Sequence, residues 1–220
     1  MTYFVYALVI FLATHLIPGI RPLRSFLVSR LGKPLYLTLF SIASVIGLGF
    51  VGWTYSAAPY LEVWLLPVEA RWFVVGAMMV SCFFVVTGVT TANPFSLGLG
   101  AGTFDPEKPG IVRVTKHPVV WGLFIWSAAH LMANGDMASL ILFGLFSLLS
   151  ALGPWVFNKR AKELMGAQEW ERAAAACQQI PIVRALTQIG LFRLVIAVAV
   201  YSFLLVAHGP VIGVSPLDGL

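Results

Sequence analysis

The sequence predicts an all-α, polytopic membrane protein with about six transmembrane helices. Hydrophobic residues make up 59% of the 220 residues and charged residues only 10%, and the mean hydropathy is +0.89. Ordinary soluble domains are about 25% charged. Apolar runs near the ~20 residues that cross a bilayer recur along the whole chain. No polar stretch is long enough for a second domain, so we expect residues 1–220 to form one transmembrane domain.

The apolar runs set the expected helices in order. The first run precedes its basic residues, which is the opposite of a cleavable signal peptide, so we interpret it as an uncleaved helix. The second contains the letters GLGFVG, but no strand precedes them, so small residues for close helix packing explain them better than a dinucleotide site. The fourth and fifth are expected to form a hairpin through Asn134-Gly135-Asp136. The six expected spans are 2–20, 34–55, 71–92, 117–134, 138–157 and 189–208.

Two of the connections have a distinct character. Residues 93–116 are rich in glycine and proline, which predicts irregular structure. Residues 158–188 carry mixed charge with alanines and Trp170, which predicts a helix at the membrane surface.

The basic residues predict the orientation. Thirteen of the fourteen lysines and arginines lie in or beside the connections 21–33, 93–116 and 158–188, and only Arg71 lies on the other side. By the positive-inside rule these connections face the cytoplasm and both termini are periplasmic. The net charge of +5 therefore reflects membrane orientation and indicates no nucleic-acid partner. The two cysteines form no recognisable disulfide or metal motif.

Histidines are the main candidates for chemistry, because ionisable groups are costly inside a bilayer. His15 lies roughly 9 Å from the cytoplasmic end of the first span, and His117 opens the fourth span at that same end. His130 lies roughly 20 Å deeper than His117 along one helix. One metal ion therefore cannot bind both His117 and His130, whereas His15 and His117 are at compatible depths.

Two histidines without a nearby carboxylate or thiolate make a poor closed zinc site, but they could complete the coordination of a haem iron. The alternative is that these histidines only form hydrogen bonds between helices. For His130 we expect a structural or substrate-side hydrogen bond, with Asn134 and Asp136 as further supporting residues.

The stretch TKHPVVWGLFIWSAAHLMANGD resembles the signature segment of the NnrU family of bacterial inner-membrane proteins. HLIPGIRPLRSFLVSRLG and KPLYLTLFSIASVIGL resemble the first two helices of that family. The family is similar to the 15-cis-ζ-carotene isomerase, a membrane enzyme that uses haem b with two histidine ligands. This likeness implies haem b with His15 and His117 as metal ligands, and Arg24 and Lys116 as further cofactor-binding residues.

Two departures from the isomerase limit what the likeness implies. Lys116 replaces the usual arginine, and Val114 stands where the isomerase has a cysteine proposed as an alternative ligand. The likeness therefore implies haem binding more directly than isomerisation. Two functions stay open. The protein could isomerise a lipid-soluble polyene, or it could act in nitric oxide and nitrite metabolism together with denitrification enzymes or a redox partner. The partner common to all these cases is membrane lipid.

A second likeness keeps another function open. KHPVVWG followed by NKRAKELMGAQEWERAAAACQQIPIV is similar to isoprenylcysteine and phospholipid methyltransferases, which bind S-adenosylmethionine. The second glutamate of their glutamate pair is missing, and Ala173 and Ala174 stand where an aromatic residue is expected. This likeness implies residues 105–117 and 159–172 closing over the cofactor. A non-catalytic membrane assembly factor is the third possibility.

Overall fold

The computed structural model describes residues 1–98, 100 and 103–218. The described residues are α-helical apart from turns, loops and one isolated bridge between Glu62 and Asp136. They form two compact units, residues 1–63 with 136–138 and residues 64–135 with 139–220, and each unit is described by itself. The all-α prediction is confirmed.

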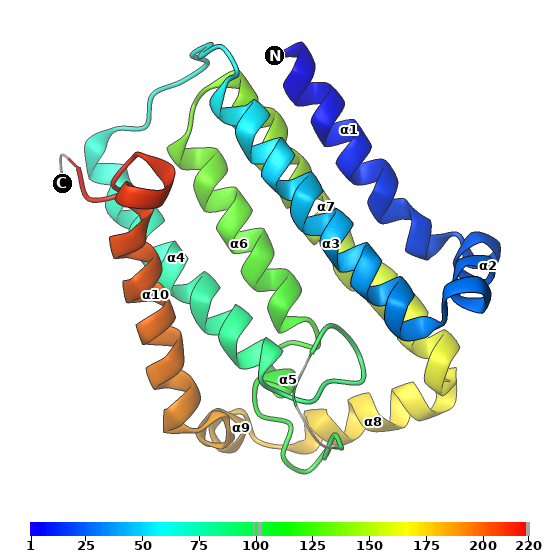
Figure 1. Cartoon of the computed structure of the whole chain (residues 1–220). Helices are drawn as coiled ribbons and strands as arrows, with labels where there is room; N and C mark the ends of the chain where they lie inside the picture. The colour runs from blue at the N-terminus through cyan, green and yellow to red at the C-terminus, as the bar shows by residue number, and fades with distance from the viewer. Residues whose placement is uncertain (99, 101–102, 219–220) are drawn as a thin grey trace. The chain divides into compact units, whose positions relative to one another are not determined.

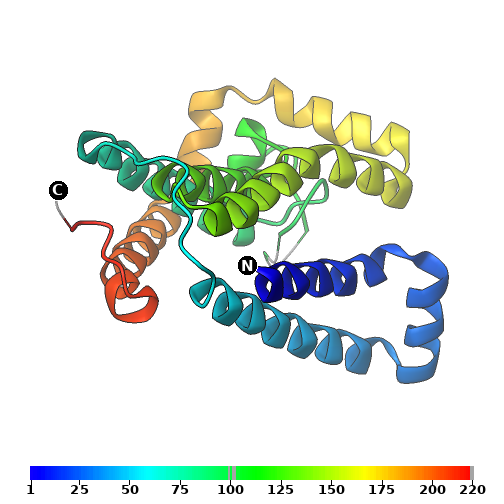
Figure 2. The same cartoon turned by 90° about the horizontal axis from the view of Figure 1, so that it is seen from above.

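The first unit is a helical hairpin. Its elements are α1 (Thr2–Leu16), the short 3₁₀-helix η1 (Ile17–Gly19), α2 (Arg21–Leu31) and α3 (Lys33–Ser56). Helices α1 and α3 run side by side in both cartoon views (Figure 1 and Figure 2). Phe4 of α1 packs edge-on against Tyr55 of α3, with ring centroids 5.9 Å apart. Phe11 lies over Gly47, where a Cβ atom would be 3.1 Å from its ring.

The long helices of the second unit are α4 (Val68–Val89), α6 (Pro118–Ala133), α7 (Met137–Met165) and α10 (Leu191–Ile212), and α4 packs against both α6 and α10 (Figure 1). The contact with α6 is close because a Cβ on Gly122 would lie 2.6 Å from Val85. In the same contact Ser81 Oγ donates a hydrogen bond of 2.8 Å to the carbonyl of Gly122.

The expected hairpin between α6 and α7 is present. Residues 134–136 join the two helices, and Ser147 Oγ of α7 donates to Ser127 Oγ of α6 at 3.0 Å. Gly153 of α7 lies against Val120, so the two helices run antiparallel over several turns.

One end of the second unit carries a small lobe that we call the basic lobe, defined as residues 93–116 and 166–189. It contains the helices α5 (Ile111–Val114), α8 (Ala167–Gln179) and α9 (Ile182–Ile189). Its core consists of Phe95, Ile111, Val112, Ala174, Cys177 and Ile189. Residues 93–110 have no regular secondary structure in their described part, and residues 158–188 are largely helical, as predicted.

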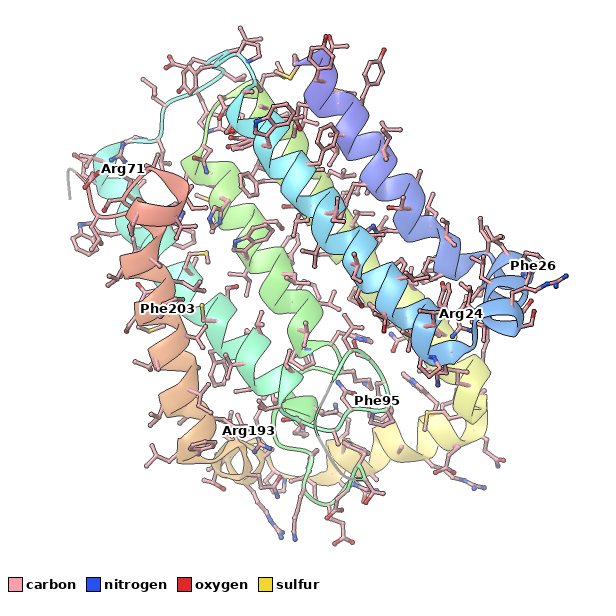
Figure 3. All side chains as sticks on the ribbon, viewed as in Figure 1. Arg24, Phe26, Arg71, Phe95, Arg193 and Phe203 are labelled. Carbon is pink, nitrogen blue, oxygen red and sulfur yellow. The ribbon has the colours of Figure 1, made fainter. Side chains whose placement is uncertain are left out.

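In the part of the chain that the structure describes, five helical segments are long and apolar enough to cross a membrane: Thr2–Gly19, Lys33–Ser56, Val68–Val89, Met137–Met165 and Leu191–Ile212. The chain is therefore a multi-helix membrane protein. Helix α10 exposes large apolar side chains, as expected of a helix that faces lipid, and Phe203 is 69% exposed (Figure 3).

The expected span at 117–134 is shorter than we predicted. Helix α6 has 16 residues, which is about 24 Å and less than the ~30 Å hydrocarbon core. It begins at Pro118, and the extended backbone of Asn134 ends it. The predicted span is longer because it includes His117 and Asn134, which cap the two ends of the helix.

Candidate functional site

His117 occupies the N-cap position of α6 and is only 4% exposed. Its Nε2 lies 3.1 Å from Oδ1 of Asn158 on α7. A carboxamide oxygen can only accept, so this bond places the ring proton on Nε2 and the lone pair on Nδ1. Nδ1 is buried and has no hydrogen-bond partner in the described part of the chain. The site therefore presents a buried imidazole lone pair that the protein itself leaves unused.

A cavity of about 490 Å³ lies near this histidine, between α4, α6, α7 and residues 94–98. Phe157 lines it, and the ring of Phe157 lies 6.4 Å from the ring of His117 between centroids. Ser96 also lines it, with a buried hydroxyl that has no partner among the described residues. Arg160 supplies a positive charge to the lining. The cavity is thus mostly apolar with two polar side chains, one of them unsatisfied, and a mostly apolar lining with a few polar groups is typical of ligand sites.

Trp170 of α8 links the basic lobe to this end of α7. The ammonium groups of Lys116 and Lys162 lie 5.4 Å and 4.5 Å from its ring centroid, within the range of cation–π contacts. Phe95 packs edge-on against the same ring at 5.7 Å. The Lys116 side chain is therefore directed to Trp170.

His15 lies in the last turn of α1 in the first unit. Its Nδ1 donates a 2.8 Å hydrogen bond to the carbonyl of Phe11, which leaves the lone pair on Nε2. The ring packs against Phe11 and Phe40, with centroid distances of 4.1 Å and 5.4 Å. Arg24 is exposed on α2 of the same unit (Figure 3).

His15 and Arg24 thus belong to the first unit, whereas His117 and Lys116 belong to the second. The pairing of His15 with His117 therefore stays a prediction. Among residues 1–98, 100 and 103–218, no group of three or more His, Cys, Asp and Glu side chains is arranged to hold a metal ion.

Of the three expected supporting residues at the other end of α6, His130 and Asn134 are in contact. His130 Nδ1 donates to the carbonyl of Trp126 at 2.9 Å, and Asn134 Nδ2 donates to the carbonyl of His130 at 2.8 Å. Asp136 belongs to the first unit, where Oδ1 accepts a 3.0 Å hydrogen bond from the Ala138 amide.

Sequence reasoning missed Asn158 and Ser96. The depth argument that paired His15 with His117 could have found Asn158, because it is a polar residue at the basic end of the next span, next to Lys159 and Arg160. No sequence signal marks Ser96, because only the fold places it in the cavity lining.

The profile of the NnrU protein family matches residues 3–216, which is nearly the whole chain. The chain belongs to the NnrU family. The resemblance predicted from the signature segment is thereby confirmed. Searches of curated proteins and of solved structures found no match. The family membership covers both units, so His15 and His117 both fall inside the NnrU match.

Proposed function

We propose that this NnrU family member is a bacterial inner-membrane protein that binds haem b, and that His15 and His117 would hold its iron. The observation that carries the proposal is the buried Nδ1 of His117, which has no partner among the described residues. An uncompensated polar atom in an apolar interior costs about 1–3 kcal/mol, and ligation of a metal would remove that cost.

The chemistry of both histidines suits the group. In each ring one nitrogen is bonded to a protein oxygen, which is Asn158 Oδ1 for His117 and the Phe11 carbonyl for His15. The other nitrogen of each ring therefore carries the lone pair that could bind a metal ion. Such outer hydrogen bonds commonly orient metal-binding imidazoles. Two imidazoles are enough for haem, because the porphyrin supplies four nitrogens. Arg24 and Lys116 are the cations we assign to the haem carboxylates.

When bound, haem b supplies a redox-active iron that can transfer electrons or polarise a conjugated double bond. The chain's own residues hold the two imidazoles in fixed orientations and exclude water around His117. Two roles suit this arrangement. One is isomerisation of a polyene that enters from lipid, and the other is service to nitric oxide or nitrite metabolism with denitrification enzymes or a redox partner.

The test is an absorption spectrum of the full chain purified from haem-replete cells. We expect a Soret band that shifts on reduction, and its loss or strong reduction in His15→Ala and His117→Ala. His130→Ala is the matched control and keeps the band. A colourless wild-type protein, or histidine variants that keep the unchanged spectrum, would refute the proposal.

The same proposal includes the membrane arrangement. The two units together form one transmembrane domain of residues 1–220, with α6 as a short sixth crossing and both termini in the periplasm. The charges support this orientation. Within the second unit the basic lobe and the start of α10 carry Lys108, Arg113, Lys116, Arg172, Arg184 and Arg193, whereas the opposite ends of α4 and α10 carry only Arg71.

One observation favours a second candidate, a methyltransferase that uses S-adenosylmethionine. Both likeness-implied segments, residues 105–117 and 159–172, meet in the basic lobe, where Lys116 and Lys162 flank Trp170 beside the 490 Å³ cavity. Isothermal titration of the full chain with S-adenosylmethionine should then give heat that Ser96→Leu abolishes. Absence of heat with the wild-type chain rejects this candidate. A chain that neither binds S-adenosylmethionine nor shows a haem spectrum would leave the non-catalytic assembly factor as the remaining function.

A further inference from the structure

A second cavity, of about 240 Å³, lies at the opposite end of the second unit from the basic lobe. Helices α4, α6 and α10 and the segment after α10 line it. Its deeper walls are apolar, with Val74 and Met78 from α4 and Leu205 from α10. Its polar groups include Arg71, which Figure 3 shows at the start of α4, together with His130 and His208.

Both histidines engage Nδ1 with a backbone carbonyl. Nδ1 of His130 lies 2.9 Å from the carbonyl of Trp126, and Nδ1 of His208 lies 2.6 Å from the carbonyl of Val214. A carbonyl can only accept, so each Nδ1 carries the proton and each Nε2 of the neutral ring is an acceptor. The ring centroids of His130 and His208 are 6.3 Å apart, so the two acceptors lie in the same part of the cavity.

Two hydrogen-bond donors of the lining are engaged with the protein. Arg71 Nη1 donates to the carbonyl of Asp218 at 2.9 Å, and the Tyr201 hydroxyl donates to the carbonyl of Val75 at 3.2 Å. Neither His130 Nε2 nor His208 Nε2 has a hydrogen-bond partner within the described ranges. The cavity therefore needs a donor from its occupant, beside an apolar body.

We infer that this cavity binds a lipid-soluble phenol of the quinol class, whose ring hydroxyl donates to Nε2 of His130 or His208. A hydrocarbon polyene has no hydroxyl to donate, and a phosphodiester offers only acceptors. A phenolic hydroxyl is a more acidic donor than an aliphatic alcohol, with a reference pKa near 10 for tyrosine, and so suits an imidazole acceptor better. The apolar tail lies along Val74, Met78 and Leu205. This inference does not depend on haem binding at His15 and His117.

Titration calorimetry on the full chain in detergent, corrected with a detergent blank, tests the site. The probe is a benzoquinol with a ten-carbon tail, and the matched ligands are its oxidised quinone, which has no hydroxyl, and decanol. We expect the quinol to bind at least about tenfold more tightly than either, because only it brings a phenolic donor to an imidazole acceptor of the cavity.

The variants locate the interaction. His130→Phe and His208→Phe keep a ring but remove the acceptor, so the single variant at the histidine that accepts the hydroxyl, and the double variant, should weaken quinol binding about tenfold. Val74→Phe leaves both histidines in place and blocks the apolar part, so it should also abolish binding. Ser29→Ala lies at an exposed position of the other unit and should leave binding unchanged. Monodisperse elution and an unchanged melting temperature show that each variant is folded.

Equal affinity for quinol and quinone, equal affinity for quinol and decanol, or wild-type affinity in the double variant His130→Phe/His208→Phe would each overturn the inference. Loss of the haem spectrum in His117→Ala with quinol binding intact would separate this site from the proposed function.

Discussion

At the scale of single residues, glycine decides how closely the helices of the second unit approach. A Cβ on Gly122 would lie 2.6 Å from Val85 Cγ2 and 3.0 Å from the Ser81 carbonyl, and the second of these atoms is backbone and cannot move aside. Close approach through small residues is a main source of helix association in membranes, where apolar burial gives no net driving force.

Gly122→Ala should therefore destabilise the chain, because α4 must shift away from α6. Overpacking of this kind costs about 1–3 kcal/mol, which corresponds to a fall of several degrees in melting temperature for a chain of this length. Thermal unfolding in detergent measures it. Gly144→Ala on α7 is the matched control, since a Cβ there meets nothing within 4 Å. Equal melting temperatures in the two variants would show that the α4–α6 contact is not tight.

Cys177 is a second residue whose environment sets its chemistry. It is 2% exposed in the core of the basic lobe, and burial raises the pKa of its thiol. A raised pKa leaves less thiolate at neutral pH, and thiolate is the reactive form.

In a Cys82→Ala background we expect native Cys177 to react with maleimide at least about tenfold more slowly than the exposed cysteine of Ser29→Cys, with a rate that increases as pH rises above about 8.5. Mass spectrometry of timed samples measures the labelling. Denaturant should abolish the difference, and fast labelling of the native chain would show that the lobe is open.

At the scale of elements, glycines between consecutive helices let the chain turn at the two ends of the 166–189 segment of the basic lobe. Gly166 separates α7 from α8 with φ +90°, and Gly190 separates α9 from α10 with φ +82°, a backbone region that favours glycine. The lobe is then held by side chains from distant segments. Arg113 Nε donates to the carbonyl of Ile180 at 2.8 Å, and Phe95 fills the centre at 1% exposure.

Phe95→Ala should loosen the lobe, because removing a buried phenylalanine costs about 3–5 kcal/mol. Limited proteolysis of the full chain in detergent should then cut residues 166–190 at least about tenfold faster than in the wild type. Leu97→Ala, at a site 44% exposed, is the control and should digest as the wild type does. Unchanged cleavage in Phe95→Ala would mean that Phe95 does not hold the lobe.

At the scale of the whole molecule, the placement of charge predicts the orientation of the chain in the membrane. Each basic connection contributes to the same asymmetry, and the connections 57–67 and 134–136 contain no lysine or arginine. Orientation by this rule requires no knowledge of helix packing.

Reporter fusions test that orientation. Alkaline phosphatase, which is active only in the periplasm, should be active after residue 220 and inactive after Gly166. A fluorescent protein that matures only in the cytoplasm should give the reverse pattern. The opposite pattern, with phosphatase active after Gly166 and inactive after residue 220, would contradict the predicted orientation. The same reporter result at both positions would mean that α10 does not cross the membrane once between them.

Part of the candidate site was accessible from the sequence. His117 follows from the cost of an imidazole near a bilayer and from its place before Pro118, and His130 is separated from it by the rise of one helix. The engagement of Asn158 with His117 was not accessible, because they are 41 positions apart in the sequence and their contact depends on how α6 and α7 pack. The same holds for His208, which meets His130 through the packing of α10.

The sequence by itself determined the helical class, the approximate spans and the family of this protein, because hydropathy, charge placement and signature residues are local properties of the chain. The tertiary structure decided that α6 is short, that the basic lobe has its own core, and which ring nitrogens of His15, His117, His130 and His208 hold a lone pair. These depend on hydrogen-bond partners and helix ends, which exist only once the segments are packed.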